Sequence, residues 1–437
     1  MSGEDNITQI YNSNKQLILP KSAEFVSADD ITFEFDTAQQ GNALIAKGHY
    51  TEEFEVPINP HNPYSGNIAE KRLYSGSVLR TDSLGYPVLG GEDYDVDNNV
   101  AYLAWNGLSW DYEVYTTWSY GHYPQPTDGF HIDSNDKYHY VIWVFHSTSE
   151  YLQHVTNASG SWVKTTIDWT NFTSEEDFSY LDSVFDKNGK LHVLYADVYG
   201  EDGRYNETSI KGMSLMHADN VTGSWRTEIV VDDIKVTGGR IVIESDNTVH
   251  LIYEKKYYYV DAGDKVHNSG YMYEVEGSYG SWSAEKVIDE TESVIDNRNY
   301  DFLAAAIDSN DKIHVVRLSK SGAGDQKKCW HYEYNPGGAV TIREIFDIVE
   351  DDNFRWPTLN VLSDDTVSYI VGVEDAGDYR VEEYIFDTSW TGGQVSFRDG
   401  ISDSPVFVSA VVLYDDSRAV VVLGDSPNYY VQYDILT

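Results

Sequence analysis

The sequence predicts an all-β fold, and within that class a seven-bladed β-propeller built from four-stranded antiparallel blades. Three observations lead to this prediction. A short phrase of a polar turn and an alternating strand recurs along the chain, which is typical of a repeat protein. The composition, with 35 Tyr, 15 Phe, 11 Trp and 33 Gly in 437 residues, suits strands and turns. The sequence also lacks the helical periodicity of apolar residues that would indicate amphipathic helices.

The recurring phrase has four close copies and three weaker ones. The close copies are DSNDKYHYVIWV from Asp133, DKNGKLHVLYAD from Asp186, SDNTVHLIYEK from Ser245 and DSNDKIHVVRLS from Asp308, and the weaker ones start at Asp95, Ser363 and Asp415. The copies can be aligned on the position that is His in the four close copies, and we call the residue at this position the anchor. The anchors are Ala101, His139, His192, His250, His314, Ser368 and Val420. Seven copies at this spacing predict seven blades.

A second phrase divides each unit into strands. Gly-Ser-Trp occurs at Gly160–Trp162, Gly223–Trp225 and Gly280–Trp282, at a regular distance after the first turn. Each unit therefore contains a strand, an Asp/Asn/Gly turn, an alternating strand, an aromatic strand, a Gly-Ser turn and a last strand. This order predicts a four-stranded antiparallel meander.

The N-terminal part differs from the repeats. We expect residues 1–22 to be an arm, extended or anchoring, and residues 23–75 to hold one or two strands and a Pro-rich loop. The propeller is predicted over residues 76–437. Its last unit, from Pro405, has room for only three strands, so we expect a strand from Ala23–Val56 to complete it and to leave no exposed edge.

The charge limits the partners of the chain. The formal net charge is -42, from 72 Asp plus Glu against 30 Lys plus Arg, which disfavours binding to nucleic acid and to anionic membranes. Such self-repulsion destabilises a compact fold unless salt screens it. We therefore expect a saline setting and halophilic behaviour, with an ordinary acidic extracellular protein as the alternative.

Two further features bear on the setting. Cys329 is the only cysteine, which excludes an intrachain disulfide. The N-terminus has neither the basic start nor the apolar stretch of a secretory signal, although the aromatic, acidic body suits work outside a cell. A virion protein reconciles both observations, and a trimmed extracellular enzyme is the alternative. No run of apolar residues is long enough to insert into a membrane.

The ligand site is expected in the loops that precede the first strand of each blade, because such loops crowd one end of a propeller channel. These loops are rich in aromatic residues and Arg, which stack on sugar rings and recognise carboxylate or sulfate. The alternative is that the aromatic side chains only fill the channel mouth. The candidate ligand-binding residues are His122, Tyr123, Tyr180, Arg298, Tyr300, Arg355 and Trp356.

Two sets of residues suggest metal ligands. The repeated His139, His192, His250 and His314 occupy equivalent places on different blades, so we expect them to pack within their blades, bonded to a turn backbone, rather than to share an ion. Asp93, Asp95 and Asp97 resemble the start of a calcium loop, but Asn98 replaces its glycine and Ala104 its last Glu. An acidic turn is the preferred interpretation and a weak calcium site the alternative, so calcium is the only cofactor considered, and none is required.

A family resemblance follows from these residues. The Asp-Ser-Asn-Asp turns before His-Val strands resemble the BNR-repeat propellers, and His122–Val155 resembles a pattern in the propeller polysaccharide lyases that act on ulvan. The resemblance implies that His122 and His146 correspond to a catalytic histidine pair, assisted by a Tyr and an Arg from later blades. The sequence departs from that pattern at Lys137, where a turn glycine is expected, and in the longer interval between the two histidines.

Three functions remain open at this point. The first is a virion or extracellular propeller, such as a tail fibre, spike or turret subunit, that binds a host-surface glycan or glycoprotein, with other virion subunits as further candidate partners. The second is a polysaccharide lyase acting on a uronate-containing polymer, which the net charge of -42 disfavours because its substrate is a polyanion. The third is a structural scaffold. We expect the first.

Overall fold

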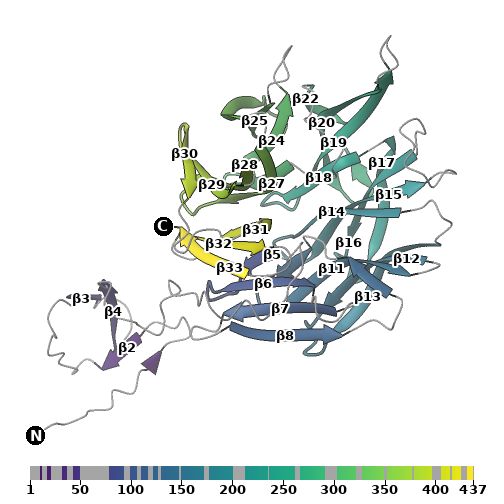
Figure 1. Cartoon of the computed structure of the whole chain (residues 1–437). Coiled ribbons are helices and arrows are strands. Elements are labelled where there is room, and N and C mark those ends of the chain that lie inside the picture. The colour runs from purple at the N-terminus through teal and green to yellow at the C-terminus, as the bar shows by residue number, and fades with distance from the viewer. Residues whose placement is uncertain are drawn as a thin grey trace, which may run out of the picture. The chain divides into compact units, whose positions relative to one another are not determined.

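The computed structural model describes strands and turns and, in the part of the chain that it describes, no helix (Figure 1). The described residues are 10–11, 17–20, 32–36, 43–49, 78–92, 99–105, 110–116, 122–125, 129–146, 149–171, 177–199, 212–234, 236–260, 266–290, 303–320, 327–348, 352–375, 378–395, 405–413, 416–424 and 431–436. The chain divides into an N-terminal unit that includes Met1–Asn62 and a second unit that holds the repeats.

The N-terminal unit contains one antiparallel sheet. Its strands are β1 (Ile10–Tyr11), β2 (Leu17–Pro20), β3 (Thr32–Asp36) and β4 (Ala43–His49), in the order β1-β2-β4-β3. In this sheet β4 pairs with β2 on one side and with β3 on the other. The expectation that a strand from Ala23–Val56 completes the last blade stays a prediction.

The second unit contains six full blades, each an antiparallel meander with at least four strands. Blade 1 has β5 (Val78–Thr81), β6 (Pro87–Glu92), β7 (Asn99–Trp105) and β8 (Trp110–Thr116). Blade 2 has β9 (His122–Gln125), β10 (Phe130–Ile132), β11 (Tyr138–His146), β12 (Ser149–Thr156) and β13 (Val163–Asn171). Blade 3 has β14 (Asp177–Phe185), β15 (Leu191–Tyr199), β16 (Gly212–Asp219) and β17 (Arg226–Ile234).

The later blades keep the same order. Blade 4 has β18 (Val236–Ile243), β19 (Val249–Val260), β20 (Val266–Ser278), β21 (Ser281–Trp282) and β22 (Lys286–Asp289). Blade 5 has β23 (Leu303–Ile307), β24 (Ile313–Lys320), β25 (Lys327–Tyr334) and β26 (Thr341–Ile348). Blade 6 has β27 (Asp352–Val361), β28 (Val367–Asp375), β29 (Asp378–Phe386) and β30 (Trp390–Val395). The last sheet has three described strands, β31 (Pro405–Val412), β32 (Arg418–Gly424) and β33 (Val431–Leu436).

The recurring phrase forms the turn between the first and second strand of each blade. In blade 2 the backbone N–H of Asp133 donates to the carbonyl of Lys137, and the same bond closes each of the other turns. The first turn begins at Asp82, not at Asp95, and Ala101 lies on β7, the third strand. The anchor Ala101 was therefore wrong, because the sequence of blade 1 carries a second acidic stretch after its second strand.

Neighbouring turns are joined by a Ser–Asp pair, which we call the turn clasp. The Asp365 carboxylate accepts hydrogen bonds from the backbone N–H and the hydroxyl of Ser309 in the preceding blade, at 2.9 and 2.8 Å. Asp365 has a φ of 67°, a conformation that usually favours glycine. The same clasp joins Ser83 to Asp136, Ser245 to Asp311 and Ser363 to Asp416. The clasp thus explains why Asp occupies this turn position with positive φ, where blades 1 and 3 have Gly85 and Gly189.

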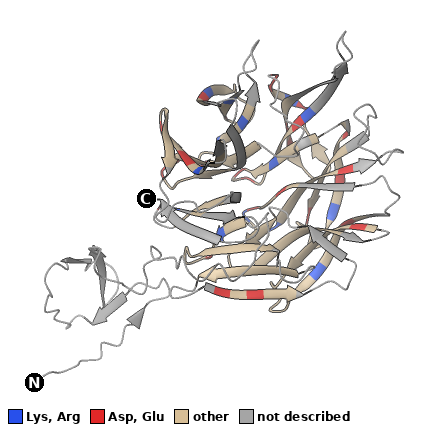
Figure 2. Ribbon diagram, viewed as in Figure 1, with Lys and Arg blue, Asp and Glu red and all other residues tan. Residues whose placement is uncertain are grey.

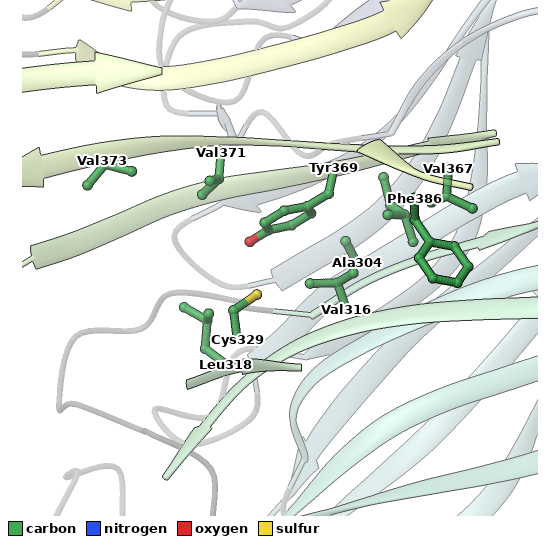
Figure 3. Close-up of a cluster of buried hydrophobic side chains, with 10 residues drawn as sticks. Ala304, Val316, Leu318, Cys329, Val367, Tyr369, Val371, Val373 and Phe386 are labelled. Atoms are coloured by element: carbon green, nitrogen blue, oxygen red, sulfur yellow. The ribbon is translucent and has the colours of Figure 1, made fainter. Parts of the chain in front are cut away.

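The hydrophobic cores lie between neighbouring blades. Figure 3 shows the cluster between blades 5 and 6, where Cys329 and Val316 face Tyr369 and Val371. Burial raises the pKa of the Cys329 thiol, which suits a core residue rather than a reactive one. Such clusters lie at each of the five seams from blade 1 to blade 6, so blades 2 to 5 bury both faces of their sheets against their neighbours, as a propeller requires.

Acidic residues lie on an outer strand of blade 1. Figure 2 marks acidic positions along the outer strand β8, where Asp111 and Glu113 lie. Among the described residues, no helix has the length and apolar character to cross a membrane.

Candidate functional site

The first strands of the blades adjoin one another and bring the upstream candidate residues to one side of the propeller unit. The strands β14, β18, β23, β27 and β31 contact one another in that order, and β31 contacts β5. We call the half of these strands that precedes the Asp turns the upstream half. The loops that lead into this half of the first strands crowd one end of a propeller, which is the usual ligand end.

In blade 2 the first strand is split at its upstream half. Both β9 and β10 pair with β11, so that they occupy the place of one strand in two pieces. In this register His122 lies directly opposite His146, and Tyr123 lies opposite Phe145. Residues directly opposite in an antiparallel pair have Cβ atoms about 4.5–5.5 Å apart. The two histidines that the resemblance singled out are therefore cross-strand neighbours on the backbone.

Four other first strands are irregular in the same half, and two of these irregularities, in β18 at Val236–Gly238 and in β31 at Pro405–Phe407, involve no candidate residue. The other two lie in β14 and β27. The pairing of β14 shifts between Tyr180 and Asp182, and that of β27 shifts between Arg355 and Thr358. Such bulges re-aim side chains and occur often beside functional sites. Trp356 falls inside the second bulge. The irregular positions thus coincide with three of the candidate residues.

The described residues do not include every candidate. The structure describes the backbone of His122, Tyr123, Tyr180, Arg355 and Trp356, all on first strands. The remaining candidates lie outside the described residues: Arg298, Tyr300, Asp93, Asp95 and Asp97.

At the other end of the blades, under the Asp turns, the repeated histidines form buried chains of polar groups. Nδ1 of His139 lies 2.9 Å from Nε2 of His154 on the next strand, and the pair His192–His217 repeats this at 3.1 Å. His314 and His331 form the third pair, at 3.0 Å. The sequence analysis missed these partners. A His three residues before Asn157 and Asn220, near the end of the third strand, was the available signal.

Each histidine pair also contacts a carboxylate of the turn above it. Nε2 of His139 lies 3.5 Å from Asp133, and Nε2 of His314 lies 3.4 Å from Asp308. In blade 4, Glu244 and Glu274 lie 2.6 and 2.8 Å from the two ring nitrogens of His250. The expected bond to a turn backbone is thus replaced by a bond to a turn side chain.

Tryptophans of the following blade cover these pairs. Trp225 meets His154 edge-on at 5.3 Å, and Trp282 and Trp390 meet His217 and His331 at 5.1 Å. The Trp of the Gly-Ser-Trp phrase therefore packs over the histidine pair of the preceding blade.

Burial keeps most of these histidines neutral. It lowers the pKa of His154 and of His331 to about 3, aided by the partner His139 or His314. Burial, with the charge of His217, lowers the pKa of His192 to about 4. Burial also acts to lower the pKa of His250, but its hydrogen bonds to Glu274 and Glu244 outweigh it and raise the pKa.

Three groups in these chains have the composition of a metal site. They are His192, His217 and Asp219; His314, His331 and Glu333; and His250, Glu274 and Glu276. In the first, Asp219 already binds Arg226 at 2.9 and 2.7 Å. In the second, Lys312 and Arg343 hold Glu333 at 2.8 and 2.6 Å. In both groups a cationic side chain, Arg or Lys, already neutralises the carboxylate. A hydrogen bond between the two histidines therefore accounts for the geometry better than a bound metal ion does.

A buried ion network joins blades 4 and 5. Arg317 is 0% exposed and donates to Glu254 at 2.6 Å and to Asp289 at 2.9 Å. The Tyr332 hydroxyl donates to the same Asp289 carboxylate at 2.5 Å. The sequence analysis missed this network because its members come from two blades.

Comparisons with known proteins give structural neighbours only. No protein-family model and no curated protein matches the chain, so the BNR-repeat assignment stays an expectation. An ulvan lyase of a polysaccharide lyase family, solved with a bound oligosaccharide, is 10% identical with a TM-score of 0.46, and the match covers 83% of this chain and 91% of that one.

Two further solved structures are similar. A protein of unknown function from Dyadobacter fermentans is 14% identical with a TM-score of 0.39, over 60% of this chain and 79% of that one. An α-L-arabinofuranosidase of Fusarium graminearum is 10% identical with a TM-score of 0.37, over 72% and 92%. At such low identity and TM-score, these likenesses assign no activity to this chain.

Proposed function

We propose that this chain is a seven-bladed propeller that binds a glycan at the upstream half of its first strands, outside the cell or on a virus particle. The single observation that carries the proposal is the coincidence of irregular backbone with candidate residues. The first strands of five blades are irregular in that half, and in three of them, β9, β14 and β27, the irregularity lies at candidate residues.

The blade count rests on the three-stranded sheet β31–β33. Its first strand contacts β27 on one side and β5 on the other. The Ser409 hydroxyl accepts the backbone N–H of Leu79 at 3.0 Å, and Asp182 accepts that of Ile241 in the same way between blades 3 and 4. Repetition of this bond at the seam with blade 1 supports the last sheet as the seventh blade.

The chemistry of the upstream half suits a sugar. Tyr and Trp offer flat faces for the apolar side of a pyranose ring, and Arg binds a carboxylate or sulfate through two parallel hydrogen bonds. A net charge of -42 repels a polyanion at long range, so recognition relies on a local Arg and on salt. A saline extracellular or virion setting satisfies both conditions.

The test is glycan binding by the full chain and by the double variant Arg355→Ala/Trp356→Ala. We expect wild type to bind at least one polysaccharide of a panel with neutral, uronate and sulfated members, and the double variant to lose that binding. Trp169→Ala is the matched control, because Trp169 is 55% exposed on the outer strand β13. Unchanged binding by the double variant, or no binding by wild type, would refute the proposal.

A second function, polysaccharide lyase, is favoured by the register of His122 opposite His146. In such a reaction one histidine removes the proton at C5 of a uronate, the C4–O bond breaks as a C4–C5 double bond forms, and the leaving oxygen takes a proton. Incubation with uronate polysaccharides would then give a growing absorbance from unsaturated ends. His122→Ala and His146→Ala would each abolish it, whereas no absorbance with wild type would exclude this reaction on the polymers tested.

A further inference from the structure

A cavity of about 420 Å³ lies at the seam between blades 5 and 6, at the end that carries the Asp turns. It is separate from the upstream half of the first strands. Blade 5 contributes Lys312, Glu333 and Arg343, and blade 6 contributes Asp364, Phe386 and Asp387.

The walls of this cavity are fixed before any ligand arrives. In the cavity wall, the Asp365 carboxylate accepts a hydrogen bond from the side-chain amide of Asn310 at 2.8 Å, in addition to those from Ser309 in the turn clasp. This bond ties the two turns together. Lys312 and Arg343 hold the two oxygens of Glu333 at 2.8 and 2.6 Å. The Arg343 guanidinium lies 4.9 Å from the centre of the Phe386 ring. Such preorganisation lowers the ordering cost of binding.

The charge of the cavity excludes anions. Lys312 and Arg343 are its two cations, and burial lowers the pKa of His314 and keeps it neutral. Five carboxylates oppose them: Asp308, Glu333, Asp364, Asp365 and Asp387. A uronate, sulfate or phosphate group would meet this excess of negative charge in the field of a chain with net charge -42.

The two walls differ in hydrogen-bonding character. The side chains of Lys312 and Arg343 are 34% and 32% exposed, so the blade 5 wall offers donors. On the blade 6 wall, Asp364 and Asp387 are exposed carboxylates and offer acceptors. An organic cation would pair with the acceptor wall but would offer no acceptor to Lys312 and Arg343 on the donor wall. A group that both donates and accepts satisfies both walls, and a sugar hydroxyl is such a group.

We propose that this seam cavity is a second binding site, for a neutral sugar. Its size suits a small saccharide, and its polar walls provide convergent hydrogen bonds. The inference stands independently of the upstream site, because it uses different residues at the other end of the blades.

The test is ligand-observed saturation-transfer NMR on the full chain, with glucose, galactose, mannose and rhamnose as neutral probes. We expect at least one of them to bind, and Asp364→Asn/Asp387→Asn to weaken it about tenfold, as expected for loss of hydrogen bonds to charged acceptors. Asp246→Asn is the matched control. Asp246 accepts the backbone N–H of Thr248 at 2.8 Å, as Asp364 accepts that of Thr366 at 2.9 Å, but it lines no part of this cavity.

Three results would overturn the inference: no binding of any neutral probe, binding unchanged in the double variant, or equal weakening by Asp246→Asn. Arg355→Ala/Trp356→Ala separates the two sites, because it leaves the seam signal intact if the inference holds. Loss of the seam signal in that variant would place the sugar at the upstream half instead. Thermal melting of all variants is measured in parallel, and equal melting temperatures show that lost binding is not caused by a folding defect.

Discussion

Acidification from about pH 7 to about pH 5 should destabilise this protein through its buried histidines. In the folded state burial lowers the pKa of His154 and of His331 to about 3 and that of His192 to about 4. In the unfolded chain a histidine titrates near 6.5. Between these values the unfolded state binds more protons, so the stability present above about pH 6.5 is lost as pH falls.

The magnitude follows from the shifts. Each of the three histidines should lower the free energy of unfolding by about 2 kcal/mol between pH 7 and pH 5. Together they remove roughly 6 kcal/mol, against a typical total stability of about 5–15 kcal/mol. His250 acts in the opposite direction. Its pKa is raised in the folded state, so its protonation stabilises the folded state as pH falls. We expect the three lowered histidines to outweigh it.

Urea unfolding followed by tryptophan fluorescence at several pH values is the suitable assay, because urea leaves the ionic strength constant. The variant His154→Gln removes one titrating group and keeps a polar partner for His139. Its stability should depend less steeply on pH, by about 2 kcal/mol between pH 7 and pH 5, whatever its stability at pH 7. A flat or rising stability of wild type from pH 7 to pH 5 would refute the reasoning, and so would an unchanged slope in His154→Gln.

Three further predictions concern the seams and the charge. Arg317→Met should cost about 3–5 kcal/mol in urea unfolding, because it leaves two buried carboxylates without their cation, and adding Glu254→Gln and Asp289→Asn should recover much of that loss. A Cβ on Gly90 would lie 2.2 Å from the Phe130 ring, so Gly90→Ala should cost about 1–3 kcal/mol and Phe130→Leu should partly rescue it; no loss would contradict the packing. Thermal stability should rise from low to molar salt, since salt screens a net charge of -42, and a flat profile would contradict the saline setting.

Much of the fold was predictable because local turn chemistry repeats. The Asp turns and the Gly-Ser-Trp turns each close with a short-range backbone hydrogen bond, such as Gly160 to Asn157, so their residues are visible in the sequence. The first copy was misplaced because Asp82–Gly85 resembles the others less than the acidic stretch from Asp95 does. The closing strand stays a prediction, since strand pairing depends on partners far away in the chain.

The site was less predictable than the fold. Sequence reasoning selected Tyr180, Arg355 and Trp356 from loops, and the structure describes them on irregular strands. It could not find the Arg317 network or the seam cavity, because both depend on which blade faces which. The histidine pairs lie within single blades, and the His three residues before Asn157 and Asn220 was the signal for two of them.

The most direct test of the glycan-binding claim is a crystal structure of the protein soaked with an oligosaccharide that it binds. The account predicts sugar density at the upstream half, beside β9, β14 and β27, with Arg355 in contact with the ligand. Density confined to other surfaces, with Arg355 and Trp356 away from it, would contradict the account.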